Sequence, residues 1–283
     1  SKSYNMLDIA ASTRYHASDN VDVVLGVSQK NRAPTYFERY TWLPLGISGG
    51  MADGFNYIGN LALDNETARQ IDVGIDYRFK SWSVSPRLFY QDIEDYITGS
   101  PSMNMAANMV STMMAGTTPF QWTNTDAVIK GADLTVSGNV FDNVRLNAVA
   151  SVQHGNRDDI DDALFRIAPE QLITTIQWDT QLLDLPMALQ LTSELAGAQN
   201  YVSALQSEST TAGYGLVHIT GLFTLIDNAR SNLQITATVH NLFDKHYAPH
   251  TAGINRVRNT DVAVGERIPA AGREWHLSLS YRF

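Results

Sequence analysis

The chain has 283 residues, a mass of 31.3 kDa and a formal net charge of -9. An acidic balance without a basic run argues against a nucleic-acid partner. The absence of cysteine excludes disulfides, thiolate metal sites and cysteine nucleophiles. No apolar run approaches the roughly 18 residues of a membrane-spanning helix. A transmembrane β-barrel remains compatible with this composition, because a barrel spreads its apolar residues over alternate positions.

Eleven segments, taken in chain order, alternate apolar and polar residues between turn residues, which predicts β-strands. The alternation is clearest where Ile71, Val73 and Ile75 face one side and Asp72 and Gly74 face the other. Most segments exceed the usual soluble strand of about 5 or 6 residues and reach the length that a bilayer requires. The predicted strands cover residues 4–16, 20–31, 67–79, 83–97, 126–140, 144–156, 169–181, 186–202, 212–225, 232–248 and 272–283.

The connections between these segments alternate strictly between short and long. Outer-membrane barrels have this asymmetry, with tight periplasmic turns and larger extracellular loops, and aromatic residues near strand ends match their interfacial girdles. We therefore predict an all-β, transmembrane antiparallel β-barrel; a soluble antiparallel sheet protein is the alternative. The long connections cover about 32–66, 98–125, 157–168, 203–211 and 249–271.

The last predicted strand places Trp275, Leu277, Leu279, Tyr281 and Phe283 on one face. If Phe283 lies in the periplasm, counting back over eleven strands places the N-terminal end of the first predicted strand, 4–16, on the extracellular side. A complete single-chain bacterial barrel has an even number of strands and both termini in the periplasm, and open edges cannot face lipid. We therefore expect residues 1–283 to form the C-terminal half of a 22-stranded barrel. The remaining half would come from upstream sequence or a separate chain.

Four segments, in order, resemble TonB-dependent outer-membrane receptors: residues 28–40, 59–67, 241–247 and 272–283. The resemblance implies a 22-stranded transporter with an N-terminal plug, located in the bacterial outer membrane and energised by the TonB complex acting on that plug. A plug and a TonB box are absent from these residues. The physical roles of the motifs are structural: Pro34 suits a strand end, Gly59-Asn60 a turn, and Asn241 and Asp244 local capping.

Methionines crowd one predicted extracellular loop, at Met103, Met105, Met109, Met113 and Met114. Thioethers select Cu(I), so Met105, Met109 and Met113, spaced four apart on a helical turn, are candidate metal ligands. The alternative is that these adaptable side chains fill apolar gaps at the barrel mouth.

The segment from His246 to Gly272 resembles the copper-receptor branch of the family. It provides His246, His250, Arg256 and Arg267 as candidate ligand-binding residues. Arginines could instead bind the carboxylates or catecholates of an anionic siderophore. A structural pairing of the arginines with Glu266 or Asp261 is the other alternative.

An enzyme is not expected, and neither is a cofactor. The acidic run 158–162 lacks the glycine and terminal glutamate of an EF-hand, which predicts solvated charge. The sequence favours a transporter of a scarce metal or metal complex, with copper as the first candidate and an iron-siderophore as the second. A passive porin with a selective lumen is the alternative function.

Overall fold

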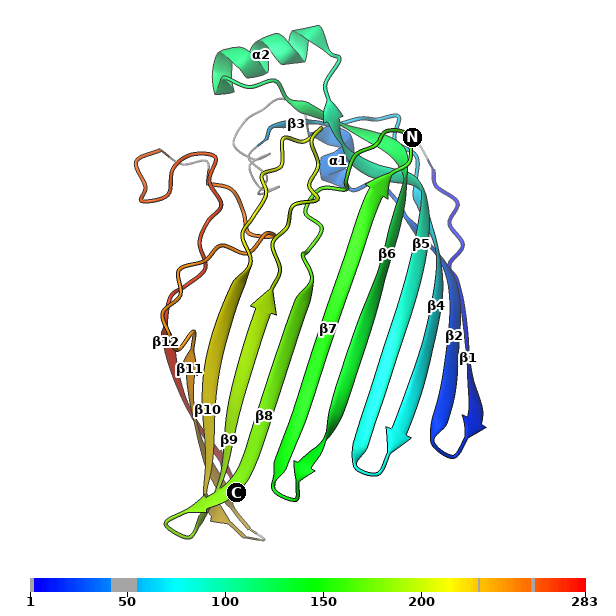
Figure 1. The fold of residues 1–283 in the computed structure, drawn as a ribbon. Coiled ribbons are helices and arrows are strands. Elements are labelled where there is room, and N and C mark those ends of the chain that lie inside the picture. Colours follow the sequence, from blue (N-terminus) through cyan, green and yellow to red (C-terminus); the bar gives the residue numbers. More distant parts are fainter. Residues whose placement is uncertain (1–2, 42–54, 229, 256–257) are drawn as a thin grey trace.

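A computed structural model describes residues 3–41, 55–228, 230–255 and 258–283. The chain forms one large sheet with hairpin turns at one end and long loops at the other (Figure 1). No helix within these residues is long and apolar enough to cross a bilayer. The elements are β1 (Ile9–Ser18), β2 (Val21–Arg32), α1 (Tyr36–Tyr40), β3 (Tyr57–Ile58), β4 (Glu66–Phe79), β5 (Trp82–Pro101), α2 (Met105–Ala115), β6 (Phe120–Phe141), β7 (Val144–Arg157), β8 (Gln171–Leu182), β9 (Leu185–Ala196), β10 (Tyr214–Asp227), β11 (Asn232–His240) and β12 (Glu274–Arg282).

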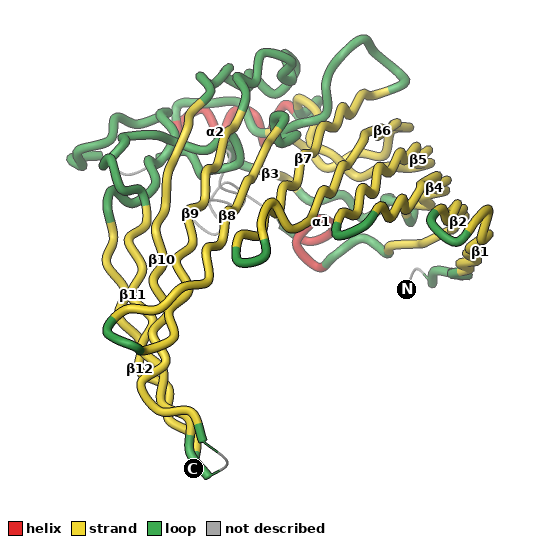
Figure 2. Tube along the Cα trace, turned by 60° about the horizontal axis from the view of Figure 1, so that its bottom comes forward, coloured by secondary structure: helices red, strands yellow, loops and turns green. Residues whose placement is uncertain are grey.

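The long strands pair with their sequence neighbours in the order β1-β2-β4-β5-β6-β7-β8-β9-β10-β11-β12, all antiparallel. The short strand β3 pairs parallel with β6. Figure 2 shows the sheet curving strongly from β1 to β12. Among the described residues the sheet is open, with β1 and β12 as its edges. The predicted all-β antiparallel architecture and the alternation of short and long connections are confirmed.

The strand register sorts the two faces of the sheet by polarity. Leu25 of β2 lies opposite Val73 of β4, and Asp22 opposite Asp76 on the other face. Along β4, the apolar row Ile71, Val73, Ile75, Tyr77 and Phe79 is 41–55% exposed. A continuous apolar surface of this kind is what a barrel presents to lipid, and the polar face is then the lumen wall.

Several predicted boundaries need correction. The strand predicted at 232–248 ends at His240, because Asn241 and Asp244 adopt positive φ angles of 48° and 53°. The Asn241 side chain caps the turn, accepting from the Lys245 N–H and donating to its carbonyl, each at 2.8 Å. The strand predicted at 186–202 ends at Ala196, and the one predicted at 126–140 already begins at Phe120. Propensity alone does not place these ends, because pairing partners decide where a strand stops.

Residues of two sequence motifs meet where β2 and β4 leave the sheet. Arg32 donates to Glu66 at 2.6 and 2.7 Å and to both carboxylate oxygens of Glu38 at 2.9 Å. Glu38 also completes a capping box with Thr35 that starts α1. Gly59 is required at its position, because a Cβ would lie 2.4 Å from the Arg39 carbonyl oxygen. The motifs therefore fix the first long loop against the sheet.

An apolar core lies under the loops at the same end of the sheet. It contains Tyr57, Leu63, Ile97, Phe120 and Trp122, all buried. The rings of Tyr57 and Trp122 stack with centroids 4.4 Å apart. Burying these large side chains offsets the entropy cost of ordering the loops above the strands.

Candidate functional site

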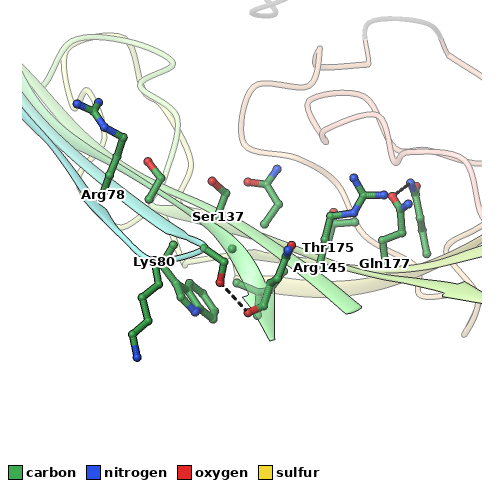
Figure 3. Close-up of a pocket in the computed structure, with 14 residues that line it drawn as sticks. Arg78, Lys80, Ser137, Arg145, Thr175 and Gln177 are labelled. Carbon is green, nitrogen blue, oxygen red and sulfur yellow. Dashed lines mark hydrogen bonds between the residues drawn. The ribbon is translucent and has the colours of Figure 1, made fainter. Parts of the chain in front are cut away.

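The polar face of the sheet carries a hollow of about 610 Å³ near the hairpin end. Figure 3 shows Ser137, Thr175, Arg145 and Gln177 standing on the same side of the strands, with Gln177 hydrogen-bonded to a neighbouring side chain. Arg145 donates to Asp179 at 2.9 Å. This part of the polar face therefore carries amide, hydroxyl and charged side chains, which can form hydrogen bonds with water and polar solutes.

A denser charge network covers the same face over β1, β2, β4 and β5. Asp22 accepts from His16 at 2.6 Å, from Arg14 at 3.0 Å and from Arg78 at 3.1 Å. Asp76 is shared by Arg14 and Arg87. Each carboxylate is thus matched by more than one cation, which stabilises charge that the strands place away from lipid.

The methionine segment, which was predicted as part of a long loop, forms the helix α2 at the loop end of the molecule (Figure 1). Asn104 caps its start by accepting from the Ala107 N–H at 3.1 Å. Ala107 and Ser111 form the buried face of the helix. The five methionines of the segment, Met103, Met105, Met109, Met113 and Met114, are 60–89% exposed. They are therefore presented to the space around the loops.

The loop candidates His250 and Arg267 lie together in a buried network, which we call the loop junction. His250 Nε2 donates to Glu208 Oε1 at 2.9 Å, and both side chains are 1% exposed. A carboxylate only accepts, so Nε2 carries the hydrogen, and Nδ1 lies 3.0 Å from the Thr211 hydroxyl. Arg267 Nη2 lies 3.8 Å from Glu208 Oε1 and donates to the Ser209 carbonyl at 3.1 Å. Arg267 thus pairs with Glu208 and not with Glu266 or Asp261.

Glu208 joins three loops of the chain. Its Oε1 accepts from the Arg166 N–H at 2.9 Å and its Oε2 from the Ser203 N–H at 3.0 Å. Burial raises the pKa of Glu208, but the hydrogen bonds from His250, Ser203 and Arg166 outweigh it, so the pKa lies below its ordinary value. Burial also lowers the pKa of Arg267. The loops that follow β7, β9 and β11 are therefore held together by one carboxylate.

His246 is exposed at the rim of a hollow of about 490 Å³, which Arg267, Tyr214 and Tyr247 also line. The two tyrosine rings lie 4.5 Å apart. The structure thus brings His246 and Arg267 to one hollow and leaves the methionine helix as a separate feature. Arg256 lies outside the described residues.

The acidic run 158–162 carries exposed charge at Asp158, Asp159 and Asp161, as predicted, but the prediction is wrong for Asp162. Asp162 is buried and accepts from the Ser203 hydroxyl at 2.6 Å and the Ala204 N–H at 2.7 Å. Asp159 accepts two hydrogen bonds from Arg157, which lower its pKa to about 2. Asp162 therefore joins the loop after β7 to the loop after β9.

Sequence reasoning missed a row of histidines on the polar face. His218 of β10, His240 of β11 and His276 of β12 have neighbouring ring centroids 5.3 and 5.2 Å apart. The only signal in the sequence is that each occupies a polar position of an alternating strand. Their adjacency depends on the register of three strands.

Residues 1–242 match the family described as TonB-dependent receptor-like, β-barrel. The chain belongs to this family. Its members lie in the bacterial outer membrane, so this protein is an outer-membrane β-barrel protein, as predicted. The family is one of receptors and transporters.

Solved structures share this fold at low sequence identity. The copper transporter OprC superposes with a TM-score of 0.75 at 20% identity, covering 95% of this chain and 39% of its own. A ferric enterobactin receptor from Pseudomonas aeruginosa has a TM-score of 0.68 at 19% identity, covering 97% and 40%. The FrpB iron transporter from Neisseria meningitidis has a TM-score of 0.65 at 14% identity, covering 96% and 38%. No curated protein matches the chain in sequence. The chain thus spans about two fifths of the length of these structures.

Proposed function

We propose that this chain forms barrel wall and extracellular ligand-binding loops of a TonB-dependent importer for a scarce metal or metal complex. The observation that carries the proposal is family membership combined with the sorting of the sheet into a lipid face and a polar lumen wall. The edges β1 and β12 carry backbone groups that must be paired within a bilayer. Further barrel strands would supply this pairing, as the C-terminal half of a 22-stranded barrel requires. The TonB complex would act through a plug outside these residues.

Copper is the first candidate substrate. Thioethers are soft ligands that select Cu(I) among biological metals. The exposure of Met105, Met109 and Met113 on α2 supports a ligand role, since buried gap-filling side chains would be covered. The fold likeness to a copper transporter is consistent with this substrate.

An iron-siderophore is the second candidate. Its anionic groups would need cationic partners at the mouth of the barrel. Arg267 lines the hollow beside Tyr214 and Tyr247, and its buried Nε has no hydrogen-bond partner among the residues that the structure describes. The fold likeness to a ferric enterobactin receptor is consistent with this alternative.

Replacing the five methionines from Met103 to Met114 with leucine tests the thioether site. Leucine keeps the apolar surface and removes the sulfur, so we expect Cu(I) affinity, measured against a competing chelator, to fall by more than about tenfold. Met187→Leu, on a strand far along the chain, is the matched control. Unchanged Cu(I) binding in the five-residue variant would remove the thioether role.

A passive porin is the alternative function. Uptake measured in cells with and without TonB separates the two. An importer loses uptake without TonB, whereas a porin retains it. TonB-independent uptake would therefore overturn the proposed mechanism even if metal binding persisted.

A further inference from the structure

The apolar face of the sheet carries a hollow of about 590 Å³ that crosses β5 to β9, strands that lie side by side (Figure 1). One side of the hollow is a row of residues that pair from strand to strand. Leu134 lies opposite Ala150, and Ala150 lies opposite Leu172, which in turn lies opposite Leu195. The three leucines are 38–47% exposed. Because alanine ends at Cβ, the row is low at Ala150 and leaves a recess between the leucines.

The other side of the hollow identifies the face on which it opens. It contains Leu88, Ala132 and Val152, which pair in that order across β5, β6 and β7. Leu88 also lies opposite Val73, a member of the exposed apolar row of β4. The side chains of directly opposed residues point to the same face of a sheet. The hollow therefore opens toward the bilayer and not toward the lumen.

Cationic and aromatic side chains form the next row of the same face toward the loops. Lys130 lies between Tyr90 and His154 in the register. Tyr201 continues the row, with its ring centroid 6.1 Å from that of His154. Lys130 and His154 are exposed, and Lys130 has no ion-pair partner among the residues that the structure describes. Tyrosine rings and a lysine at this height are typical of the boundary between the apolar core of a bilayer and its headgroups.

We propose that the hollow and this row together bind one phosphate-bearing lipid of the outer membrane, with an acyl chain in the hollow and the phosphate at Lys130 and His154. Lipid tails are as apolar as leucine, so burial of a chain by itself selects no lipid. An unfilled recess loses dispersion contacts, which favours a chain that follows its shape. The lysine ammonium supplies the opposite charge, and an imidazole N–H supplies a further donor to the phosphate oxygens.

Two carboxylates near the hollow restrict where an anionic headgroup can lie. Glu170 lines the hollow on the side of β8 and β9, away from β5. Asp92 of β5 lies one row further toward the loops and faces Arg69 in the register. Neither carboxylate lies in the row of Lys130. The phosphate is therefore favoured over β6 and β7 and disfavoured over β8 and β9.

The test measures lipid binding by native mass spectrometry of the receptor, purified from outer membranes and stripped of lipid in detergent. The probe is dioleoyl phosphatidylglycerol. Dioleoylglycerol has the same chains without the phosphate, and glycerol phosphate has no chains. We expect the receptor to bind phosphatidylglycerol more tightly than dioleoylglycerol, without displacement by glycerol phosphate. Lys130→Gln removes the charge, so we expect its phosphatidylglycerol affinity to fall roughly fivefold. Lys245→Gln, an exposed lysine in the loop after β11, is the matched control.

Ala150→Phe fills the recess with a ring, so we expect weaker binding of both lipids. Ala237→Phe is its matched control, because Ala237 lies opposite Leu277 on the apolar face but outside the hollow. Losses in Lys130→Gln and Ala150→Phe, with both controls unchanged, support the site.

Several results would overturn the lipid site. They are equal phosphatidylglycerol binding by all the variants, equal binding of the two lipids by the unmodified receptor, and displacement by glycerol phosphate. A receptor dimer that Ala150→Phe abolishes would also overturn it, because a second copy of the chain would then cover the hollow. The site rests on the proposed role of the chain as barrel wall. Failed lipid binding leaves TonB-dependent uptake intact, and TonB-independent uptake leaves the lipid result unchanged.

Discussion

The loop junction gives the sharpest prediction about stability. Glu208 and His250 are both 1% exposed, and Glu208 also accepts from the backbone of Arg166 and Ser203. Glu208→Ala leaves these donors buried and removes the partner of Arg267. Breaking a buried pair by removing one member costs about 3 to 5 kcal/mol. We take the lower figure, about 3 kcal/mol, because the loops can open locally and admit water.

Hydrogen–deuterium exchange of individual amides measures this change directly. A loss of about 3 kcal/mol corresponds to a roughly 150-fold faster exchange where the loop recloses faster than it exchanges, so that the opening equilibrium sets the rate. The Ser203 and Arg166 amides report on it, since both donate to Glu208 in the native structure. Glu266→Ala, an exposed change in the loop after β11, is the matched control. Unchanged protection of both amides in Glu208→Ala would refute the junction, as would an equal loss in Glu266→Ala.

Three further predictions concern the same end of the molecule. The pKa of Glu208 is lowered in the folded state, so its stabilisation is complete above its ordinary pKa and is lost as the pH falls through the lowered value; loop proteolysis should accelerate in acid, and Glu208→Gln should flatten that dependence. Gly59→Ala places a Cβ 2.4 Å from the Arg39 carbonyl oxygen, so we expect the loop backbone to shift and the amide of residue 59, which donates to the Thr41 carbonyl, to exchange faster with solvent. Leu63→Ala empties a fully buried position and should lower the free energy of unfolding in urea by about 3 kcal/mol; a change below 1 kcal/mol would contradict the core assignment.

The motif residues show which structural roles could be predicted from the local sequence and which could not. Pro34 was expected at a strand end, and β2 indeed ends at Arg32. Asn241 was expected to cap local backbone groups, and its side chain does so. The joining of Arg32 to both Glu38 and Glu66 was not predicted, because it depends on two loop conformations that bring distant residues together.

The acidic run shows the opposite case. Composition indicated solvated charge at 158–162, yet Asp162 is buried against Ser203 of another loop. A carboxylate can be buried only where donors surround it, and those donors come from a segment about forty residues away. Charge patterning within one segment carries no information about such donors.

The sequence by itself determined the strands, their two faces and the alternation of turns and loops. These properties follow from side chains that point to opposite sides with period two, which is local information. Only the tertiary structure decided that His250 pairs with Glu208 and that His218, His240 and His276 stand in a row. Both arrangements arise from strand register and loop contacts between residues far apart in the chain. Their geometry is set by pairing and packing, which alternation along one strand does not encode.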